Sequence, residues 1–159
     1  MTHLSISTAT VTTVVAEVAA WGARDVETGG FLLADEDGAI ACVALSGAAG
    51  IRRHRDQFVV SGCAMAMLFA YAEEHGYTIR AQFHSHGGRA FLSRSDIRHG
   101  FSVDGFVTTV LPSYETPPAA LSTWGWWTYR DGWTPTAAPL VVAGDTRVVR
   151  FDEDGARES

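Results

Sequence analysis

Two histidines that lie two residues apart at the end of an apolar run constrain this chain more than any other feature. Residues 83–96 read FHSHGGRAFLSRSD. Residues i and i+2 of a β-strand point to the same side of a sheet, so His84 and His86 can direct their imidazoles to one point. Asp96 follows in a Ser-x-x-Asp segment at the predicted start of a helix and can return to that point. Two nitrogens and one carboxylate oxygen, with a fourth position open, are the ligand set of a catalytic zinc site.

A second segment places a glutamate directly ahead of an apolar strand. Residues 26–33 read VETGGFLL, so that Glu27 opens a Glu-x-x-Gly pattern. With His-x-His and Ser-x-x-Asp downstream, the chain resembles the JAMM (JAB1/MPN/Mov34) zinc metalloprotease family, and its prokaryotic single-domain members in particular. The resemblance covers most of the chain. It implies the cytidine-deaminase-like JAMM/MPN fold, an α/β fold with a mixed β-sheet flanked by helices.

The chain departs from the family pattern in the loop between the second histidine and the serine. This loop, residues 87–92, is one residue shorter than the pattern, and Gly87 stands where the family often has proline. Taken singly, each motif residue has a plainer interpretation: a solvent-facing histidine, a surface glutamate, or a helix first-turn carboxylate favoured by the helix dipole. Because all of them occur together in the family's order, we favour the functional interpretation and treat the short loop as a one-residue deletion.

The resemblance also implies a role for each motif residue. His84, His86 and Asp96 are expected to bind Zn²⁺, which lowers the pKa of a bound water toward about 7. Glu27 is expected to take the proton from this water and deliver it to the departing amine. Ser93 is expected to donate a hydrogen bond to the oxyanion, although its position also makes it the expected N-cap of the following helix.

Length and composition place the chain among ordinary globular proteins. The 159 residues suit one domain, which we expect to span residues 1–151, with residues 152–159 forming a disordered polar tail. No apolar run reaches the ~18 residues that a membrane span needs, and the N-terminal segment lacks the basic residues of a signal peptide. A net charge of −6 disfavours a nucleic-acid-binding surface. We therefore expect a cytoplasmic protein that binds neither membrane nor nucleic acid.

Hydrophobic periodicity and turn residues predict alternating helices and strands. Helices are expected after Ser7, after Ser61 and at residues 93–99, and the segment 46–57 is expected to be a loop. In the family, a variable segment near this loop helps to hold the substrate's extended tail. Strands are expected at residues 4–7, 30–34, 39–45, 78–84, 106–111 and 121–129, with a last strand or arm at residues 141–151.

Two further features each leave two interpretations open. The basic cluster at residues 52–55 is either a solvated loop or a patch that meets an acidic partner, and we slightly favour the loop. In the aromatic run near residue 125, Trp124 and Trp126 should share one face of a strand, with Trp127 and Tyr129 on the other. One face is expected to be core, and the other is either core or an interaction surface.

The resemblance implies cleavage of a peptide or isopeptide bond just after the C-terminal glycine of a ubiquitin-like protein, in a prokaryotic and most naturally bacterial system. Activating and conjugating enzymes would be further partners. One alternative is the processing of a sulfur-carrier protein in cofactor or cysteine biosynthesis, which would use the same site. An alternative of another class is an inactive MPN-type scaffold, for which the shortened loop is the only support.

Overall fold

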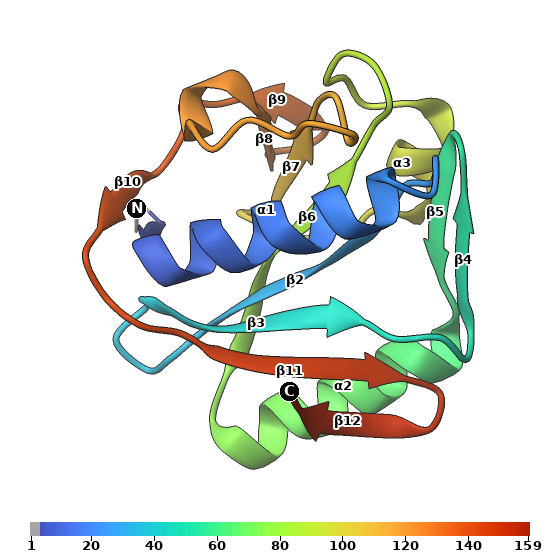
Figure 1. The fold of residues 1–159 in the computed structure, drawn as a ribbon. Coiled ribbons are helices and arrows are strands. Elements are labelled where there is room, and N and C mark those ends of the chain that lie inside the picture. Colours follow the sequence, from blue (N-terminus) through green and yellow to red (C-terminus); the bar gives the residue numbers. More distant parts are fainter. Residues whose placement is uncertain (1–3) are drawn as a thin grey trace.

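The computed structural model describes residues 4–159 of the chain (Figure 1). In chain order the elements are β1 (Ser5–Ser7), α1 (Thr8–Gly22), β2 (Gly29–Ala34), β3 (Ile40–Ser46), β4 (Ile51–His54), β5 (Gln57–Val60), α2 (Gly62–His75), β6 (Thr78–Ser85), α3 (Arg94–His99), β7 (Val107–Leu111), the 3₁₀ helix η1 (Leu121–Thr123), β8 (Gly125–Tyr129), β9 (Trp133–Pro135), β10 (Leu140–Val142), β11 (Arg147–Asp152) and β12 (Gly155–Glu158).

An eight-stranded mixed sheet organises these elements, in the order β12-β11-β3-β2-β6-β7-β8-β9. Strand β6 pairs in parallel with β7 and β11 pairs in parallel with β3, whereas the other neighbours within the sheet are antiparallel. Two-stranded pairings, β1 with β10 and β4 with β5, lie outside this sheet. The predicted fold class, an α/β fold with a mixed sheet flanked by helices, is confirmed.

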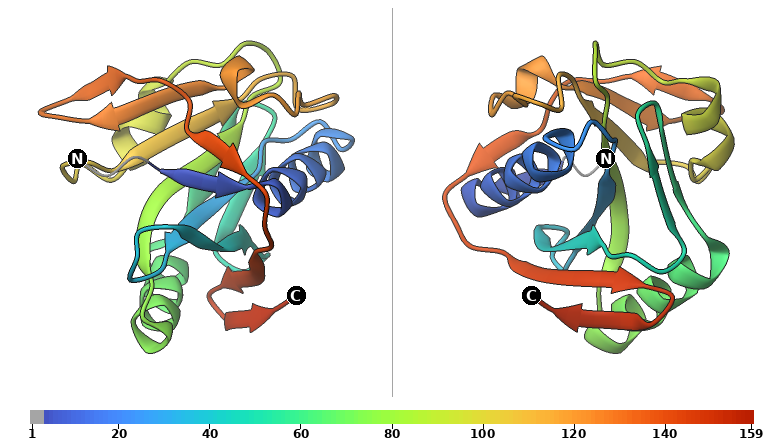
Figure 2. Two further views of the ribbon diagram at one scale, coloured as in Figure 1. Left: turned by 90° about the vertical axis from the view of Figure 1, so that its left-hand side faces the viewer. Right: turned by 45° about the vertical axis from the view of Figure 1, so that its right-hand side comes forward.

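The two longer helices cover opposite faces of the sheet (Figure 2). Val14 and Val18 of α1 pack in a core cluster with Leu32, whereas Leu68 of α2 packs in a second cluster with Leu33. Successive residues of β2 thus enter different cores, and all six residues of the strand are buried. A strand covered on both faces reads as a continuous apolar run, as residues 29–34 do.

The helix boundaries follow from local capping chemistry. The Ser7 hydroxyl accepts a hydrogen bond from the Thr10 N–H at 3.1 Å and begins α1. The Ser61 hydroxyl accepts from the Ala64 N–H at 3.1 Å and begins α2, which ends at Gly76 in the left-handed conformation (φ 72°). The starts of both helices agree with those expected from the sequence.

The segment predicted as a loop at residues 46–57 is instead largely an antiparallel hairpin. Strands β4 and β5 pair Ile51 with Val60 and His54 with Gln57 around a two-residue turn, Arg55-Asp56. The turn lacks the Asn-Gly or Asp-Gly pair that marks most short hairpins, and the charged residues on β4 hide its strand character. The favoured loop interpretation of residues 52–55 is therefore wrong.

The C-terminal segment also differs from its prediction. Residues 152–159 were expected to be disordered, but β12 pairs with β11, and Ala156 packs against the core beneath α2. Gly155 adopts φ 122°, which suits glycine, and the Arg157 guanidinium lies 3.0 Å from the buried Asp152 carboxylate. A short polar sequence conceals this strand because ion pairing and turn chemistry, rather than hydrophobic alternation, hold it in the sheet.

The aromatic run divides between the two faces as predicted. Trp124 and Trp126 are buried and stacked, with ring centroids 5.8 Å apart, whereas Trp127 and Tyr129 are half-buried on the other face. The first face is core, as expected. Within residues 4–159, no helix has the length and apolar character needed to cross a membrane.

Candidate metal centre

Three predicted ligands meet where β6 ends. The ligand atoms of His84, His86 and Asp96 all lie within 4.8 Å of one another. The Nε2 atoms of both imidazoles are 3.1 Å from the same carboxylate oxygen, Oδ2 of Asp96. His84 and His86 are buried, and the side chain of Asp96 is 8% exposed. The three side chains therefore form a group that could hold a metal ion.

The backbone around the histidines is fixed by neighbouring strands. The His86 N–H donates to the Leu111 carbonyl at 2.9 Å, and the His86 carbonyl accepts from the Tyr114 N–H at 3.0 Å. His86 Nδ1 lies 3.2 Å from the Arg89 carbonyl. Because a carbonyl can only accept, this contact places a proton on Nδ1, so Nε2, 3.1 Å from Asp96 Oδ2, is the ring nitrogen that would bind a metal. An outer hydrogen bond of this kind commonly orients a metal-binding histidine.

A capping box at the start of α3 holds Asp96. The Ser93 hydroxyl accepts from the Asp96 N–H at 3.0 Å, and the Ser93 N–H donates to Asp96 Oδ2 at 2.9 Å. Ser93 is therefore the N-cap that its position predicts. Accepting one hydrogen bond leaves its hydroxyl proton free to be donated elsewhere.

The Asp96 carboxyl is held in its ionised form. Burial alone would raise its pKa, but the His84 and His86 imidazoles and the Ser93 N–H outweigh burial, so the pKa lies well below its usual range. Asp96 thus presents a negative charge to the two imidazoles.

Glu27 completes the cluster from the segment before β2. Its Oε2 lies 4.0 Å from His86 Nε2, and its side chain is only 4% exposed. The Glu27 N–H donates to the His54 carbonyl at 2.8 Å, so the hairpin missed in the sequence fixes its backbone. Burial, followed by the charges of Asp96 and Asp56, raises the pKa of Glu27 to about 9, and the metal-free protein favours its neutral form.

The glycines after Glu27 are required by close strand packing. A Cβ atom at Gly29 would lie 2.5 Å from the Phe83 carbonyl oxygen, and one at Gly30 would lie 2.2 Å from the Ala44 carbonyl oxygen. Both contacts are with backbone, which cannot move aside cheaply. Gly29 pairs in register with His84, so this tight packing places Glu27 beside the histidines.

Two buried polar atoms of the cluster lack a partner of their own. Among the described residues, neither Glu27 Oε1 nor His84 Nε2 has a hydrogen bond, because the 3.1 Å approach of His84 Nε2 to Asp96 lacks hydrogen-bond geometry. Buried polar groups are rarely left without partners. The unsatisfied atoms fit a site completed by a cation and a water molecule, and the two-nitrogen, one-oxygen donor set suits zinc.

The cluster opens onto a cavity of about 540 Å³. Glu27, His86 and Ser93 line it, so all three face one space, together with Gly87 and Gly88 of the short loop. Residues that the sequence analysis did not assign to this site complete the lining: Asp25, Arg55, Asp56, Phe91, Tyr114 and Glu115.

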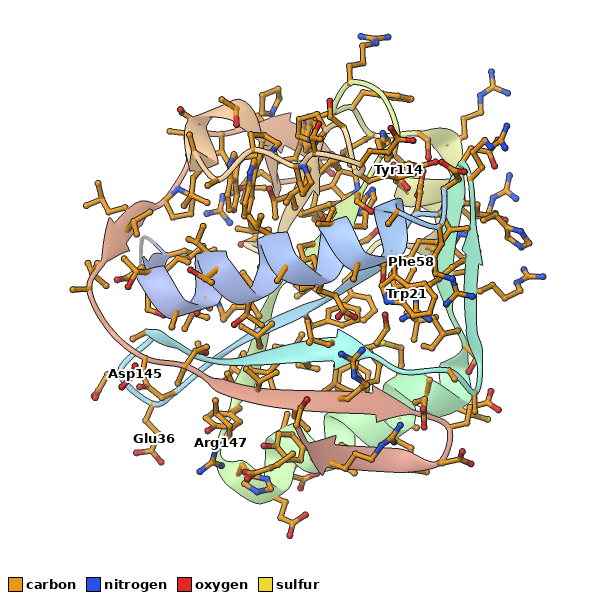
Figure 3. The ribbon with its side chains drawn as sticks, viewed as in Figure 1. Trp21, Glu36, Phe58, Tyr114, Asp145 and Arg147 are labelled. Atoms are coloured by element: carbon orange, nitrogen blue, oxygen red, sulfur yellow. The ribbon has the colours of Figure 1, made fainter. Side chains whose placement is uncertain are left out.

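Most of these additional residues come from turns and loops. Figure 3 labels Tyr114, from the loop after β7, on the same side of the molecule as Phe58 of β5. The Tyr114 hydroxyl lies 3.5 Å from the Arg55 carbonyl at the hairpin turn. No sequence motif predicts these loop residues, because the β6–β7 and β4–β5 strand pairings are what bring them to the site.

Comparisons with known proteins locate the fold. No protein-family model matches the chain, and no curated protein matches it. A solved structure from Desulfitobacterium hafniense is similar, with a TM-score of 0.63 and 15% identity over 89% of this chain and 93% of that one. A protein from Salinibacter ruber gives a TM-score of 0.54 and 19% identity over 88% and 92%. These likenesses show a shared fold.

The structural neighbours also include a JAB1/MPN domain protein from Archaeoglobus fulgidus. Its TM-score is 0.49, with 15% identity over 89% of this chain and 99% of that one. At these identities the comparisons concern the fold alone, and any inference about catalysis rests on the side chains of this protein.

Proposed function

We propose that this protein is a JAMM-type zinc metallopeptidase that cleaves after the C-terminal glycine of a ubiquitin-like protein in a prokaryotic system. The observation that carries the proposal is the convergence of three ligand atoms within 4.8 Å, with Glu27 directly beside them. The residues come from three separate segments that the family resemblance had already selected. Their convergence at one buried point is what a metal site requires.

Zinc is the proposed metal, held by His84, His86 and Asp96 with one position left open. When bound, it would supply a Lewis acid that makes hydroxide available from water near neutral pH. The charge of Asp96 and the imidazole orientation set by the Arg89 carbonyl both prepare the ligands for a cation.

Glu27 is proposed as the proton carrier. It is buried, its Oε1 has no hydrogen-bond partner among residues 4–159, and it lines the cavity in which a substrate would lie. A cation bound beside it would favour its ionised form, and a carboxylate in this position can take a proton from the attacking water and return it to the leaving amine.

Ser93 is proposed as the oxyanion donor. Its hydroxyl accepts from the Asp96 N–H while keeping its own proton, so capping the helix and donating to an oxyanion are compatible. Ser93 also lines the cavity beside Glu27.

The substrate is proposed to enter as an extended, glycine-ended tail. Gly87 and Gly88 line the cavity without side chains, which leaves space for another main chain. Extended peptides commonly bind proteins through such main-chain contacts. Removal of a conjugated modifier and maturation of a precursor would use the same tail, as would processing of a sulfur-carrier protein. Activating and conjugating enzymes are proposed as partners in the first two cases.

A cleavage assay tests this function directly. Ubiquitin-like and sulfur-carrier proteins, each fused through its terminal glycine to a reporter, would be incubated with the zinc-loaded protein. Glu27→Gln, which keeps the side-chain volume, should lower turnover by ~10²–10⁴-fold while zinc content stays at one per chain. Glu36→Gln is the matched control, because Glu36 is exposed in the β2–β3 turn, far from Tyr114 in Figure 3.

The possible outcomes of this assay distinguish a peptidase from an inactive scaffold. Cleavage after the glycine that chelation and Glu27→Gln both abolish would support the proposal, and the substrate cleaved would distinguish a modifier from a sulfur carrier. Stoichiometric zinc without cleavage of any fusion would contradict the proposed substrate class. Protein that neither binds zinc nor cleaves would instead be an inactive scaffold.

A further inference from the structure

A second cavity, of about 560 Å³, lies away from the metal centre. Its lining shares no residue with the cavity that contains Glu27 and His86. The walls are mainly apolar and include Val107, Trp126 and Leu140, and residues 136–139, between β9 and β10, form part of the lining. Cavities of this size and character commonly hold small organic molecules.

Arg80 lines this mainly apolar cavity without an acceptor for its Nε. Arg80 Nε is buried and has no hydrogen-bond partner among residues 4–159. Within residues 4–159, four arginines form ion pairs with carboxylates, and Arg80 is not among them: Arg130, Arg147, Arg150 and Arg157. A buried donor on a charged group that lacks an acceptor is costly, so an anion in the cavity would relieve that cost.

An irregularity in β6 accounts for the position of Arg80. Leu32 of β2 pairs with Ala81 and Leu33 pairs with Ile79, so Arg80 is the extra residue of a β-bulge. A bulge re-aims one side chain out of the regular alternation. Ala81 then packs in the core beneath α1 and Ile79 in the core beneath α2, while Arg80 lines the cavity.

A second guanidinium stands at the same cavity. Arg130 lines it and lies 3.3 Å from Asp104, whose side chain is 81% exposed. An ion pair with so exposed a carboxylate contributes little and competes weakly with a ligand. The hydroxyls of Thr128 and Thr136 add neutral donors at the lining.

We propose that this cavity binds a small organic carboxylate with an apolar body. A carboxylate matches the free Nε–H of Arg80, because a guanidinium can approach one side-on with parallel N–H···O bonds. Val107, Trp126 and Leu140 would contact the apolar body. The site is distinct from the metal centre: Arg80 precedes His84 by four residues on β6, ~13 Å along a strand.

Octanoate is a suitable probe, and 1-octanol is its neutral counterpart of equal chain length. Titration of the isotope-labelled protein would be followed in ¹H–¹⁵N correlation spectra. We expect saturable shifts of the amides of Arg80, Val107 and Thr128, and binding of octanol that is weaker by ~10-fold or more. This comparison uses only the unaltered protein and needs no peptidase activity.

Arg80→Gln tests the arginine itself. It should weaken octanoate binding by ~10-fold or more and leave octanol binding unchanged. Arg52→Gln, at an exposed arginine on β4, is the matched control and should change neither. Thermal melts would confirm that both variants fold. Absence of saturable shifts, shifts remote from the cavity, or equal affinity for octanoate and octanol would overturn the proposal.

Discussion

The two ends of strand β6 present opposite chemical problems. At its C-terminal end, two imidazoles and two carboxylic groups crowd around one buried point, and two of their polar atoms lack partners among the described residues. Four residues before His84, the Arg80 guanidinium borders a mainly apolar cavity without an acceptor for its Nε. The crowded end is electron-rich and calls for a cation, whereas the other end carries a cation and calls for an anion. Strand β6 thus carries two sites of opposite charge, and each contains at least one buried polar atom without a hydrogen-bond partner among the described residues.

The sharpest way to break this comparison is to remove the anionic ligand at the crowded end. Asp96→Asn keeps the shape of the side chain and an oxygen for the capping box, but it removes the charge that faces both imidazoles. We expect zinc content to fall from one per chain to near zero after dialysis, with complete loss of any peptidase activity. Metal analysis by mass spectrometry would measure the change.

Asp145→Asn is the matched control for Asp96→Asn. Asp145 is exposed at the opposite side of the molecule from Tyr114 in Figure 3. It should leave zinc content unchanged. Full zinc retention by Asp96→Asn would show that the cluster does not need the Asp96 charge to hold the metal.

The next largest effect separates the two roles of Ser93. Ser93→Ala should lower turnover ~100-fold through loss of an oxyanion donor, and should also lower the free energy of unfolding by ~1 kcal/mol through loss of the cap. Ser61→Ala removes the corresponding cap from α2, together with a 2.6 Å hydrogen bond to the exposed Glu153, and Ser61 does not line the cavity at the cluster. It should lower the free energy of unfolding at least as much, without the loss of turnover. Equal turnover in both variants would make Ser93 a capping residue only.

A pair of arginine variants tests whether Arg80 is unsatisfied in the way that the comparison requires. Arg53 donates hydrogen bonds to Thr28 Oγ1 at 3.0 Å and to the Ser46 and Gly47 carbonyls at 2.7 Å, and it stacks on Trp21. Arg53→Met should therefore lower the free energy of unfolding by ~2–3 kcal/mol.

By contrast, Arg80→Met should change the free energy of unfolding by less than ~1 kcal/mol, in the stabilising direction, since it removes an unpaired charge. Urea unfolding of both variants beside the wild type measures the difference. A loss at Arg80 as large as that at Arg53 would mean that Arg80 is satisfied within the fold, which would remove the second half of the comparison.

The crowded end of β6 could be predicted from sequence because its information is local. His84 and His86 share a strand face by parity alone, and Ser93 and Asp96 are spaced for a capping box. Glu27 required the family pattern as well, since nothing in its own neighbourhood indicates that it lies beside His86. The predicted strands and helices around these residues were correct for the same reason: each rests on periodicity or a cap.

The remaining features depend on contacts between distant segments. The bulge that directs Arg80 exists only in the pairing of β6 with β2, and its cavity is closed by residues from four parts of the chain. Hairpin β4–β5 was missed because the charged residues of β4 conceal its alternation, and strand β12 was missed because ion pairs of Arg157 and Glu158 help to hold it. Periodicity detects burial, and these elements are only partly buried.

Asp152 provides a contrasting test, as a buried carboxylate that the protein satisfies by itself. It accepts hydrogen bonds from Arg157 at 3.0 Å, from the Ala48 N–H at 3.0 Å and from the Asp154 N–H at 2.9 Å. The Arg157 guanidinium, against the opposing effect of burial and with help from the two amides, holds its pKa well below the usual range. Because the folded pKa is lower than the unfolded one, Asp152 stabilises the fold fully above about pH 4, and this contribution is lost as pH falls further.

Asp152→Asn should accordingly lower the free energy of unfolding by ~1–2 kcal/mol at pH 7, and the difference from wild type should shrink toward pH 2. Asp37→Asn, at an exposed turn residue, should show no such difference. Chelation should leave the Asp152 effect unchanged, because Arg157 and two backbone amides already satisfy that carboxylate. A chelator-sensitive Asp152 effect would instead couple β12 to the metal centre, and the cluster at the end of β6 would no longer be a self-contained site.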